Sequence, residues 1–323
     1  MEKSYKPIPK HLNNYLDWID VEKGLSSQTQ ETYSRYLKRF IEWLEEKNLS
    51  DLKPHQLDPD HIWKYRIYLA RQTTSKNSNQ TLSRSTQKSY LTALRSLMSY
   101  FASRDIEALP PEKIELPKDQ GSDSPQFLTT DQLERLFEVP DTSSKIGLRN
   151  RAILETLFST GMRVSELVDL DRDQIEPSLE QESLELGIVG KGNKARTVYF
   201  SNKALKWLKK YLETRNDDAD ALFVNYRKRS DASRRLTTRS IEKIVKNTAI
   251  EAGLPSNTTP HVLRHSFATN LLNQGVDLRV VQEFLGHESI TATQIYTHVT
   301  SKKLKDIHKE FHENNNQESA TNN

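Results

Sequence analysis

The stretch ALPPEKIELPKDQGSDSPQ, residues 108–126, divides the sequence into two parts. It contains four prolines, one glycine and scattered polar residues. Because proline lacks a backbone N–H and fixes φ, this composition cannot sustain a helix or a packed strand. We therefore expect an interdomain linker over 108–126, an N-terminal domain over 1–107 and a second domain over 127–312. The polar, low-complexity run 313–323 is typical of a disordered tail.

On the N-terminal side of the linker, apolar and aromatic residues recur at helical spacing. Four helices are expected, near 10–22, 26–48, 59–72 and 83–101. Ser27 followed by Gln30 predicts a capping box at the start of the second helix. This part of the chain is thus predicted to be a small all-helical domain.

On the C-terminal side, one β element interrupts a mostly helical pattern. In ESLELGIVGKGNKARTVYF, residues 182–200, apolar residues alternate on both sides of Gly190 and Gly192, which predicts a hairpin with Lys191 near its tip. Helices are expected to resume at Thr129, with Gln132 as a capping partner. Further helices are expected at 201–214, 238–252, 261–274, 277–285 and 290–298. The predicted fold class is mainly α, with two domains and a small β-hairpin in the second.

Composition points to a soluble cytoplasmic protein. The chain of 323 residues has no apolar run near 18 residues, and its N-terminus lacks the core of a signal peptide. It has no cysteine, which excludes a disulfide scaffold and any cysteine-ligated metal.

The distribution of charge is more informative than the net charge of +3. No acidic residue occurs between Asp60 and Asp105, and a second basic cluster begins at Arg227. A single block of this kind is often only a solvated face, but two blocks favour a nucleic-acid-binding surface. The candidate DNA-binding residues are Lys64, Arg66, Arg71, Arg84, Lys88, Arg95, Arg234, Arg235 and Arg239.

The stretch PHVLRHSFAT, residues 260–269, places His261, Arg264 and His265 within five positions. A guanidinium disfavours charging of neighbouring imidazoles and repels a metal ion, so this cluster is suited to an anion. A zinc site built from His261, His265 and His287 is the alternative, and the charge of Arg264 argues against it. We expect no metal and no cofactor.

Other candidate residues also have ordinary structural explanations. Arg163 and Glu166 are spaced for a contact between positions i and i+3 of a helix, which is often a surface ion pair. Together with Lys191, His261, Arg264 and Tyr296, however, Arg163 meets the needs of phosphoryl transfer. Guanidiniums and imidazoles can hold the phosphate oxygens, a lysine can protonate the leaving alkoxide, and a tyrosine can attack the phosphorus.

Four motifs occur in order along the chain: TGMRVSEL, GKGNKAR, HVLRHSFAT and LGHESITATQIYTH. With them the sequence resembles the tyrosine recombinases, and within them the bacterial and archaeal Xer recombinases, over about residues 10–312. One departure is Val198–Tyr199, where many relatives have Val-Pro, and it loosens the expected register of the second strand.

The resemblance implies a SAM-like core-binding domain and a catalytic domain that close on a DNA duplex. It implies that Arg163, Lys191, His261, Arg264 and His287 surround the scissile phosphate, with Lys191 as general acid. Tyr296 would be the nucleophile of a 3′-phosphotyrosyl intermediate, with Glu166 and His265 in support. No metal or ATP would be needed.

The resemblance further implies a tetramer on a palindromic, dif-like site that resolves chromosome dimers during cell division. A second Xer paralogue and a septal DNA translocase are possible partners. Two alternatives stay open: a phage or mobile-element integrase with the same chemistry, and a non-catalytic helix-turn-helix regulator.

Overall fold

The computed structural model describes residues 1–73, 81–117, 126–190, 195–226 and 234–286. The chain forms two compact units, Met1–Ser122 and Asp123–Asn323, and each has its own hydrophobic core. None of the helices in these ranges combines the length and apolar character that a membrane span requires.

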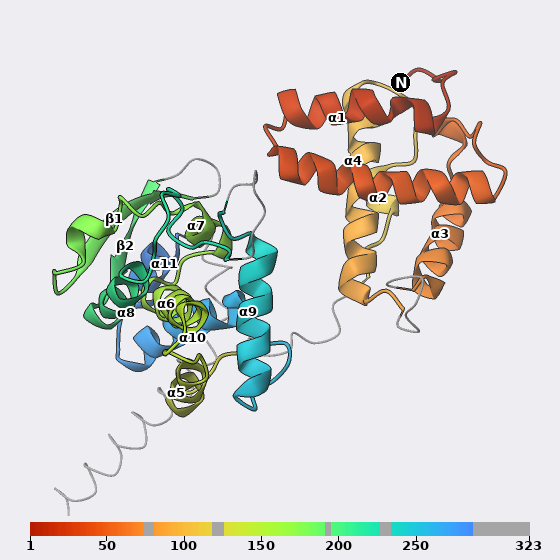
Figure 1. Cartoon of the computed structure of the whole chain (residues 1–323). Helices are drawn as coiled ribbons and strands as arrows, with labels where there is room; N and C mark the ends of the chain where they lie inside the picture. Colours follow the sequence, from red (N-terminus) through yellow and green to blue (C-terminus); the bar gives the residue numbers. More distant parts are fainter. Residues whose placement is uncertain (74–80, 118–125, 191–194, 227–233, 287–323) are drawn as a thin grey trace, which may run out of the picture. The chain divides into compact units, whose positions relative to one another are not determined.

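The first unit contains four α-helices in its described part, as the sequence predicts. They are α1 (Leu12–Val21), α2 (Ser27–Glu46), α3 (Pro59–Arg71) and α4 (Arg84–Ser103). Short 3-10 turns lie at Ile8–His11, Pro54–Gln56 and Pro111–Lys113. Figure 1 shows α1 and α2 lying side by side and crossing α4, with α3 next to α4. Their apolar faces meet in a core that includes the fully buried Trp43 and Tyr65.

Two details of the first unit differ from the sequence prediction. The prediction of a capping box at Ser27 is wrong, because α2 has Ser26 as its N-cap. The side-chain amide of Gln30 donates instead to Asp20 Oδ1 (2.7 Å) and to the Leu25 carbonyl (2.8 Å). Residues 108–117, placed in the linker by their composition, pack against this unit. Ile114 is fully buried in its core, because apolar side chains between the prolines find a surface to cover.

The second unit is built around α6. Its described elements are α5 (Thr130–Glu138), α6 (Lys145–Thr160), α7 (Val164–Asp169), a 3-10 turn (Glu176–Ser178), β1 (Leu184–Val189), β2 (Ala195–Phe200), α8 (Asn202–Leu212), α9 (Thr238–Glu251), α10 (Pro260–Asn273) and α11 (Leu278–Leu285). Helix α6 packs against α5, α8, α9, α10 and β2, so it lies at the centre of the unit (Figure 1).

Several local predictions for this unit are confirmed. The capping box at Thr129 is present, with the Thr129 N–H donating to Gln132 Oε1 at 2.9 Å. Strands β1 and β2 form the antiparallel hairpin, and the pairs Leu186–Val198 and Glu185–Tyr199 show that the register holds through Tyr199. The loosening expected at Tyr199 is therefore absent. The expected fold class, mainly α with two domains and a small β-hairpin, is confirmed.

Candidate active site

The site begins with a change of chain direction at the end of α6. Gly161 ends that helix in the left-handed conformation, with φ at +58°. A side chain here would be strained, and an added Cβ would lie 2.4 Å from Cδ1 of Phe267. The glycine thus allows α10 to approach closely and places Arg163, two residues on, at the N-cap of α7.

Arg264 is the buried centre of the site, with 3% of its surface exposed. It lies on α10, and its guanidinium donates to the carbonyl of Gly161 (2.6 Å) and to the carbonyl of Leu285. These carbonyls end α6 and α11, where helices leave acceptors unpaired and carry partial negative charge. Two helix termini therefore hold a charge that would be costly to bury without hydrogen bonds.

Arg163 lies near the same helix termini. Its Nη2 donates to the carbonyl of Gly286 at 3.3 Å, one residue after the carbonyl that Arg264 uses. Its Nη1 donates to Glu166 Oε1 at 3.1 Å, so the i, i+3 contact expected from the sequence is present. The backbone N–H of Arg163 donates to the other oxygen of Glu166 at 2.7 Å. The side chain of Arg163 is 28% exposed, which leaves it accessible to a ligand.

Arg196 is a site residue that the sequence reasoning missed. It lies on β2, and Nη1 and Nη2 donate to the two carboxylate oxygens of Glu166 at 2.6 and 2.7 Å. Burial favours the neutral form of Glu166, but the hydrogen bonds and charges of Arg196 and Arg163 outweigh it and lower the pKa of Glu166. Arg196 is the last residue of the GKGNKAR motif, and its place in that motif could have marked it as a site residue. Sequence spacing alone does not connect it with Glu166.

The two histidines of α10 stay uncharged at neutral pH. Burial lowers the pKa of His265 to about 4, and the nearby His261 and Arg264 act in the same direction. His261 is exposed, yet partial desolvation and the charges of Arg264 and Arg163 lower its pKa as well. The ring centroids of the two histidines lie 6.1 Å apart. A neutral imidazole can still donate one N–H, so His261 can bind an anionic oxygen without carrying a charge.

The described part of the site presents guanidinium N–H donors, which suit an anion. No group of histidine, aspartate and glutamate side chains that could hold a metal occurs in the described part of the chain. The acidic side chain that we find in the site, Glu166, uses both oxygens on guanidiniums. The zinc alternative also needs His287, which lies outside the described residues, as do Lys191 and Tyr296.

The predicted DNA-binding residues have different environments. On α3, Lys64 pairs with Asp60 at 2.6 Å, and the guanidinium of Arg66 lies 5.7 Å from the ring centroid of the exposed Trp63. Three more predicted residues, Arg71, Arg84 and Arg239, are exposed. Lys88 on α4 is partly buried, and Arg234 has 57% of its side chain exposed.

Two of the predicted basic residues, Arg95 and Arg235, donate hydrogen bonds from their guanidinium groups to backbone carbonyls. Nε of Arg95 donates to the Pro111 carbonyl at 3.1 Å and fixes the segment after α4. Nη1 of Arg235 donates to the carbonyls of Val168 (2.6 Å) and Leu170 (2.9 Å). Nη2 of Arg235 bonds Asp171. Arg95 and Arg235 thus already form hydrogen bonds within the protein.

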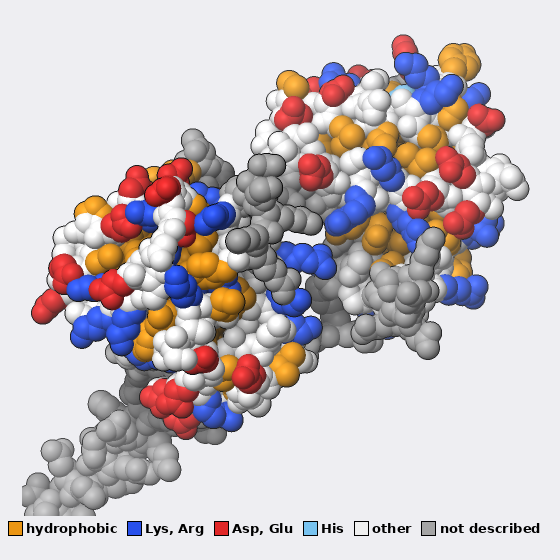
Figure 2. Space-filling model, in the orientation of Figure 1, with side chains coloured by type: hydrophobic (Ala, Val, Ile, Leu, Met, Phe, Trp, Pro, Cys, Tyr) orange, Lys and Arg blue, Asp and Glu red, His pale blue; other side chains and the backbone are white. Residues whose placement is uncertain are grey.

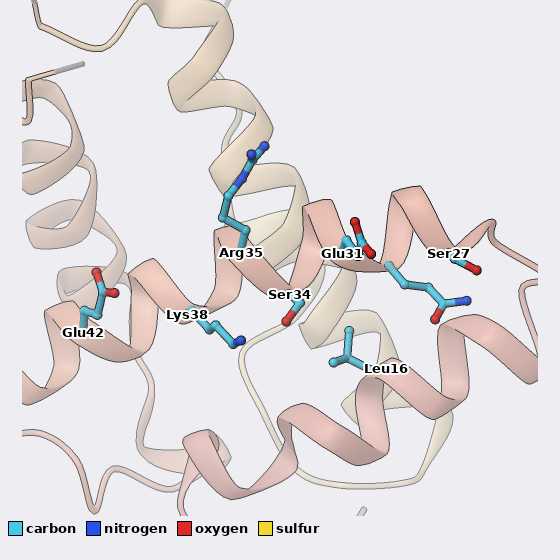
Figure 3. A pocket seen from close by; sticks show the side chains of 8 residues that line it. Leu16, Ser27, Glu31, Ser34, Arg35, Lys38 and Glu42 are labelled. Carbon is cyan, nitrogen blue, oxygen red and sulfur yellow. The ribbon is translucent and has the colours of Figure 1, made fainter. Parts of the chain in front are cut away.

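Charge on the visible face is mixed, since Figure 2 shows lysine and arginine side chains interspersed with acidic ones on both units. A hollow over α1 and α2 of the first unit has the same character (Figure 3). It is lined by Leu16, Ser27, Gln30, Glu31, Ser34, Arg35, Lys38 and Glu42. This hollow lies in the first unit, whereas Arg163, His261 and Arg264 all lie in the second.

Comparisons with known proteins agree with this geometry. Residues 126–303 match the model of the phage integrase family, and residues 11–108 match the phage integrase N-terminal SAM-like domain. The tyrosine recombinase XerD of Listeria monocytogenes serotype 4b (strain F2365) is 37% identical over 313 residues, which cover 93% of this chain and 98% of the relative.

Solved structures show the same similarity. The crystal structure of the XerH site-specific recombinase bound to a palindromic difH substrate, a post-cleavage complex, is 25% identical, with a TM-score of 0.64. The alignment covers 96% of this chain and 98% of that one. The XerH pre-cleavage complex with difH is 24% identical, covers 95% and 98%, and has a TM-score of 0.68, which supports the fold.

Proposed function

The chain belongs to the phage integrase family as a Xer-type tyrosine recombinase, and on that premise we propose that it cleaves and rejoins DNA at a specific site through a 3′-phosphotyrosyl intermediate. The observation that carries the proposal is the convergence of Arg163 and Arg264 on neighbouring carbonyls at the end of α11, with His261 beside them. This arrangement presents positive charge and N–H donors to an anion.

The proposed reaction gives each site residue a distinct role. The hydroxyl oxygen of Tyr296 attacks the scissile phosphorus as its proton passes to water, and the bond from phosphorus to the 5′ oxygen breaks. Lys191 gives a proton to that oxygen, which leaves as a 5′-hydroxyl. Arg163, Arg264 and His261, joined by His287, stabilise the charge on the non-bridging oxygens. The phosphate stays on the tyrosine as an ester, so rejoining needs no ATP.

The arginines replace a metal ion in this mechanism. A divalent cation would need oxygen ligands, and both oxygens of Glu166 are engaged by guanidiniums. The positive charges of Arg163, Arg196 and Arg264 would also repel it. We therefore propose that cleavage depends on neither a metal nor another cofactor.

The proposed DNA-binding surfaces lie on both units. We assign residues 1–107 to core binding, 108–126 to the connection and 127–312 to catalysis, with 313–323 as a tail. Phosphate contacts are proposed from Lys64, Arg66, Arg71, Arg84, Lys88, Arg234 and Arg239. Such contacts position a protein on DNA and make its affinity fall with salt.

We propose chromosome-dimer resolution at a dif-like site in the cytoplasm as the biological role. The relatives named XerD and the XerH complexes with difH support it. Recombination of two duplexes requires four cleavages, so the proposed machine is a tetramer on two palindromic sites. A paralogue or a septal translocase as further partner belongs to the same proposal.

A nicked suicide duplex tests the proposed activity. The duplex carries a palindromic site that this protein selects from a randomised DNA pool. We expect a protein–DNA adduct that survives denaturation, forms with EDTA present and ATP absent, and frees a 5′-hydroxyl end. A non-catalytic regulator would retard the duplex on a native gel and give no adduct, which would overturn the proposal.

A further inference from the structure

Arg196 forms a buried ion pair inside the proposed active site although it carries none of the assigned chemistry. Its side chain is 10% exposed and that of Glu166 is 5% exposed. The two terminal nitrogens face the two carboxylate oxygens, at 2.6 and 2.7 Å. This bidentate geometry is the strongest that an arginine and a carboxylate can form. Glu166 is thus held more firmly by the side chain of Arg196 than by the side chain of Arg163, whose Nη1 is 3.1 Å away.

The packing around Arg196 holds its side chain next to Gly286, whose carbonyl accepts a hydrogen bond from Arg163. A Cβ on Gly286 would lie 2.7 Å from Cδ of Arg196, and Gly286 has a left-handed φ of +61°. The absence of a side chain at Gly286 therefore gives room to the stem of Arg196. The Gly286 carbonyl accepts from Arg163 at 3.3 Å, so Arg163 and Arg196 share both Gly286 and Glu166 as neighbours.

The charges of this cluster do not cancel. One carboxylate faces two guanidiniums, which leaves one positive charge in excess. If Glu166 faced Arg163 alone, its negative charge would neutralise the guanidinium in a site where water screens poorly. Within the described contacts, Arg163 uses two of its five N–H donors, so donors remain for a phosphate.

We propose that Arg196 is a positioning residue that takes up the charge of Glu166, so that Glu166 orients Arg163 while Arg163 keeps its positive charge for the scissile phosphate. This inference rests on the proposed function. It also gives the hairpin a second role, because β2 places Arg196 five residues after Lys191. The strand that follows Lys191 in the chain thus also helps to keep the positive charge of Arg163. Arg163 and Arg264 together are called the clamp.

The test compares a charged with a neutral scissile group. Single-turnover cleavage is measured with the selected suicide duplex, carrying either a normal phosphate or a methylphosphonate at the scissile position. The methylphosphonate has no negative charge, so it does not need the excess positive charge of Arg163. We expect Arg196→Gln to cleave the phosphate at least about tenfold more slowly, the scale of a 1.4 kcal/mol change, with gel-shift affinity retained.

The substrate comparison and two further variants separate charge from packing. On methylphosphonate the difference between wild type and Arg196→Gln should shrink to within about threefold. In an Arg196→Gln background, Glu166→Gln should restore cleavage of the phosphate, because the uncompensated carboxylate is gone. Arg196→Lys keeps the charge and should retain most of the rate, and it remains informative if Arg196→Gln folds poorly.

Arg215→Gln is the matched control. Arg215 pairs with Asp217 at 2.6 and 3.3 Å and is also buried in the same unit, with 2% of its side chain exposed. It should lower thermal stability and leave the ratio of the two substrates unchanged.

Three results would overturn the inference: full activity of Arg196→Gln, an equal loss on both substrates, or no recovery in the double variant. A wild type that forms no adduct on the phosphate duplex would instead contradict the proposed function.

Discussion

Single residues in this site owe their properties to neighbours that sequence spacing reveals only in part. The contact between Arg163 and Glu166 follows from their spacing, and it is present. The proximity of Arg264 to the histidines predicts that they stay neutral, and their pKa values are indeed lowered, first by burial and then by nearby charges that include Arg264. The contact between Glu166 and Arg196 spans 30 positions and joins α7 to β2, so no local pattern predicts it.

The two clamp arginines should differ in their effect on stability. We expect Arg163→Ala and Arg264→Ala each to slow cleavage by two or more orders of magnitude, about 3 kcal/mol, the scale for removing one oxyanion donor. Arg264→Ala should also cost about 1–3 kcal/mol of unfolding free energy, because it leaves the buried carbonyls of Gly161 and Leu285 without their partner. Arg163 is partly exposed, so its loss should destabilise less.

Single-turnover kinetics and urea unfolding on the same preparations check this pair. Equal destabilisation by both variants would contradict the assignment of Arg264 as the buried member. Normal cleavage by either variant would remove that arginine from the clamp.

The low pKa of His265 makes stability depend on pH. In the unfolded chain a histidine binds a proton below about 6.5, whereas His265 in the native state does so only below about 4. Its contribution is therefore fully present above pH 6.5 and is lost as the pH falls from there towards 4. We expect His265→Gln to lose less thermal stability than wild type between about pH 7.5 and about pH 5.

Melting curves of wild type and His265→Gln at the two pH values measure this difference. An identical acid response of wild type and His265→Gln would show that His265 is protonated as easily in the native state as in the unfolded chain.

At the scale of elements, helix termini organise the site, and the sequence predicts many of them. Glycines with positive φ at 253, 275 and 286 directly follow the helices expected at 238–252, 261–274 and 277–285. The error at Ser27 arose because Ser26 and Ser27 both suit an N-cap, and tertiary contacts of Gln30 decided between them. Residues 108–117 of the expected linker pack against the first unit, because proline content predicts the absence of helix but not the absence of packing.

Gly161 offers a test of the element that joins α6 to α7. A left-handed conformation costs a residue with a side chain about 1–2 kcal/mol. In Gly161→Ala the new Cβ would also meet the Phe267 ring at 2.4 Å, so either the ring or the turn must move. We expect Gly161→Ala to lower the unfolding free energy by more than this conformational cost alone. Cleavage should also be slower, because the Gly161 carbonyl that accepts from Arg264 would shift.

Gly253→Ala is the control for this test. Gly253 has a similar φ of +67°, and an added Cβ would meet no atom within 4 Å. It should show the conformational cost alone, with normal cleavage. If both variants lose the same stability and cleave alike, close approach of Phe267 does not determine the turn.

At the scale of the whole molecule, two compact units suit an enzyme that holds a duplex and transfers a phosphate. The order of four motifs along the chain predicts the family, and the comparisons confirm it. Assembly is a separate matter, since the stretch TSKKLKDIHKEFHE, residues 300–313, lies outside the described residues. Its sequence places Leu304, Ile307 and Phe311 on one helical face, and so short a helix needs a groove to bury them.

We predict that this segment docks on a neighbouring protomer and transmits the state of one subunit to the next. Truncation after Thr300 should leave half-site affinity near normal and lower cooperativity on a full palindrome. Gel-shift titrations of half-site and full-site duplexes with both proteins measure the change. Unchanged cooperativity would show that the segment packs on its own subunit.

The central claim is that Tyr296 carries the cleaved strand, and the identity of the linked residue tests it most directly. The adduct from the suicide duplex is digested with protease and nuclease, and the nucleotide-bearing peptide is sequenced by mass spectrometry. We predict a 3′-phosphate on Tyr296, and no adduct from Tyr296→Phe, which loses only the nucleophilic oxygen and should bind the duplex as wild type does. A nucleotide on another residue, or an adduct that persists in Tyr296→Phe, would contradict the account.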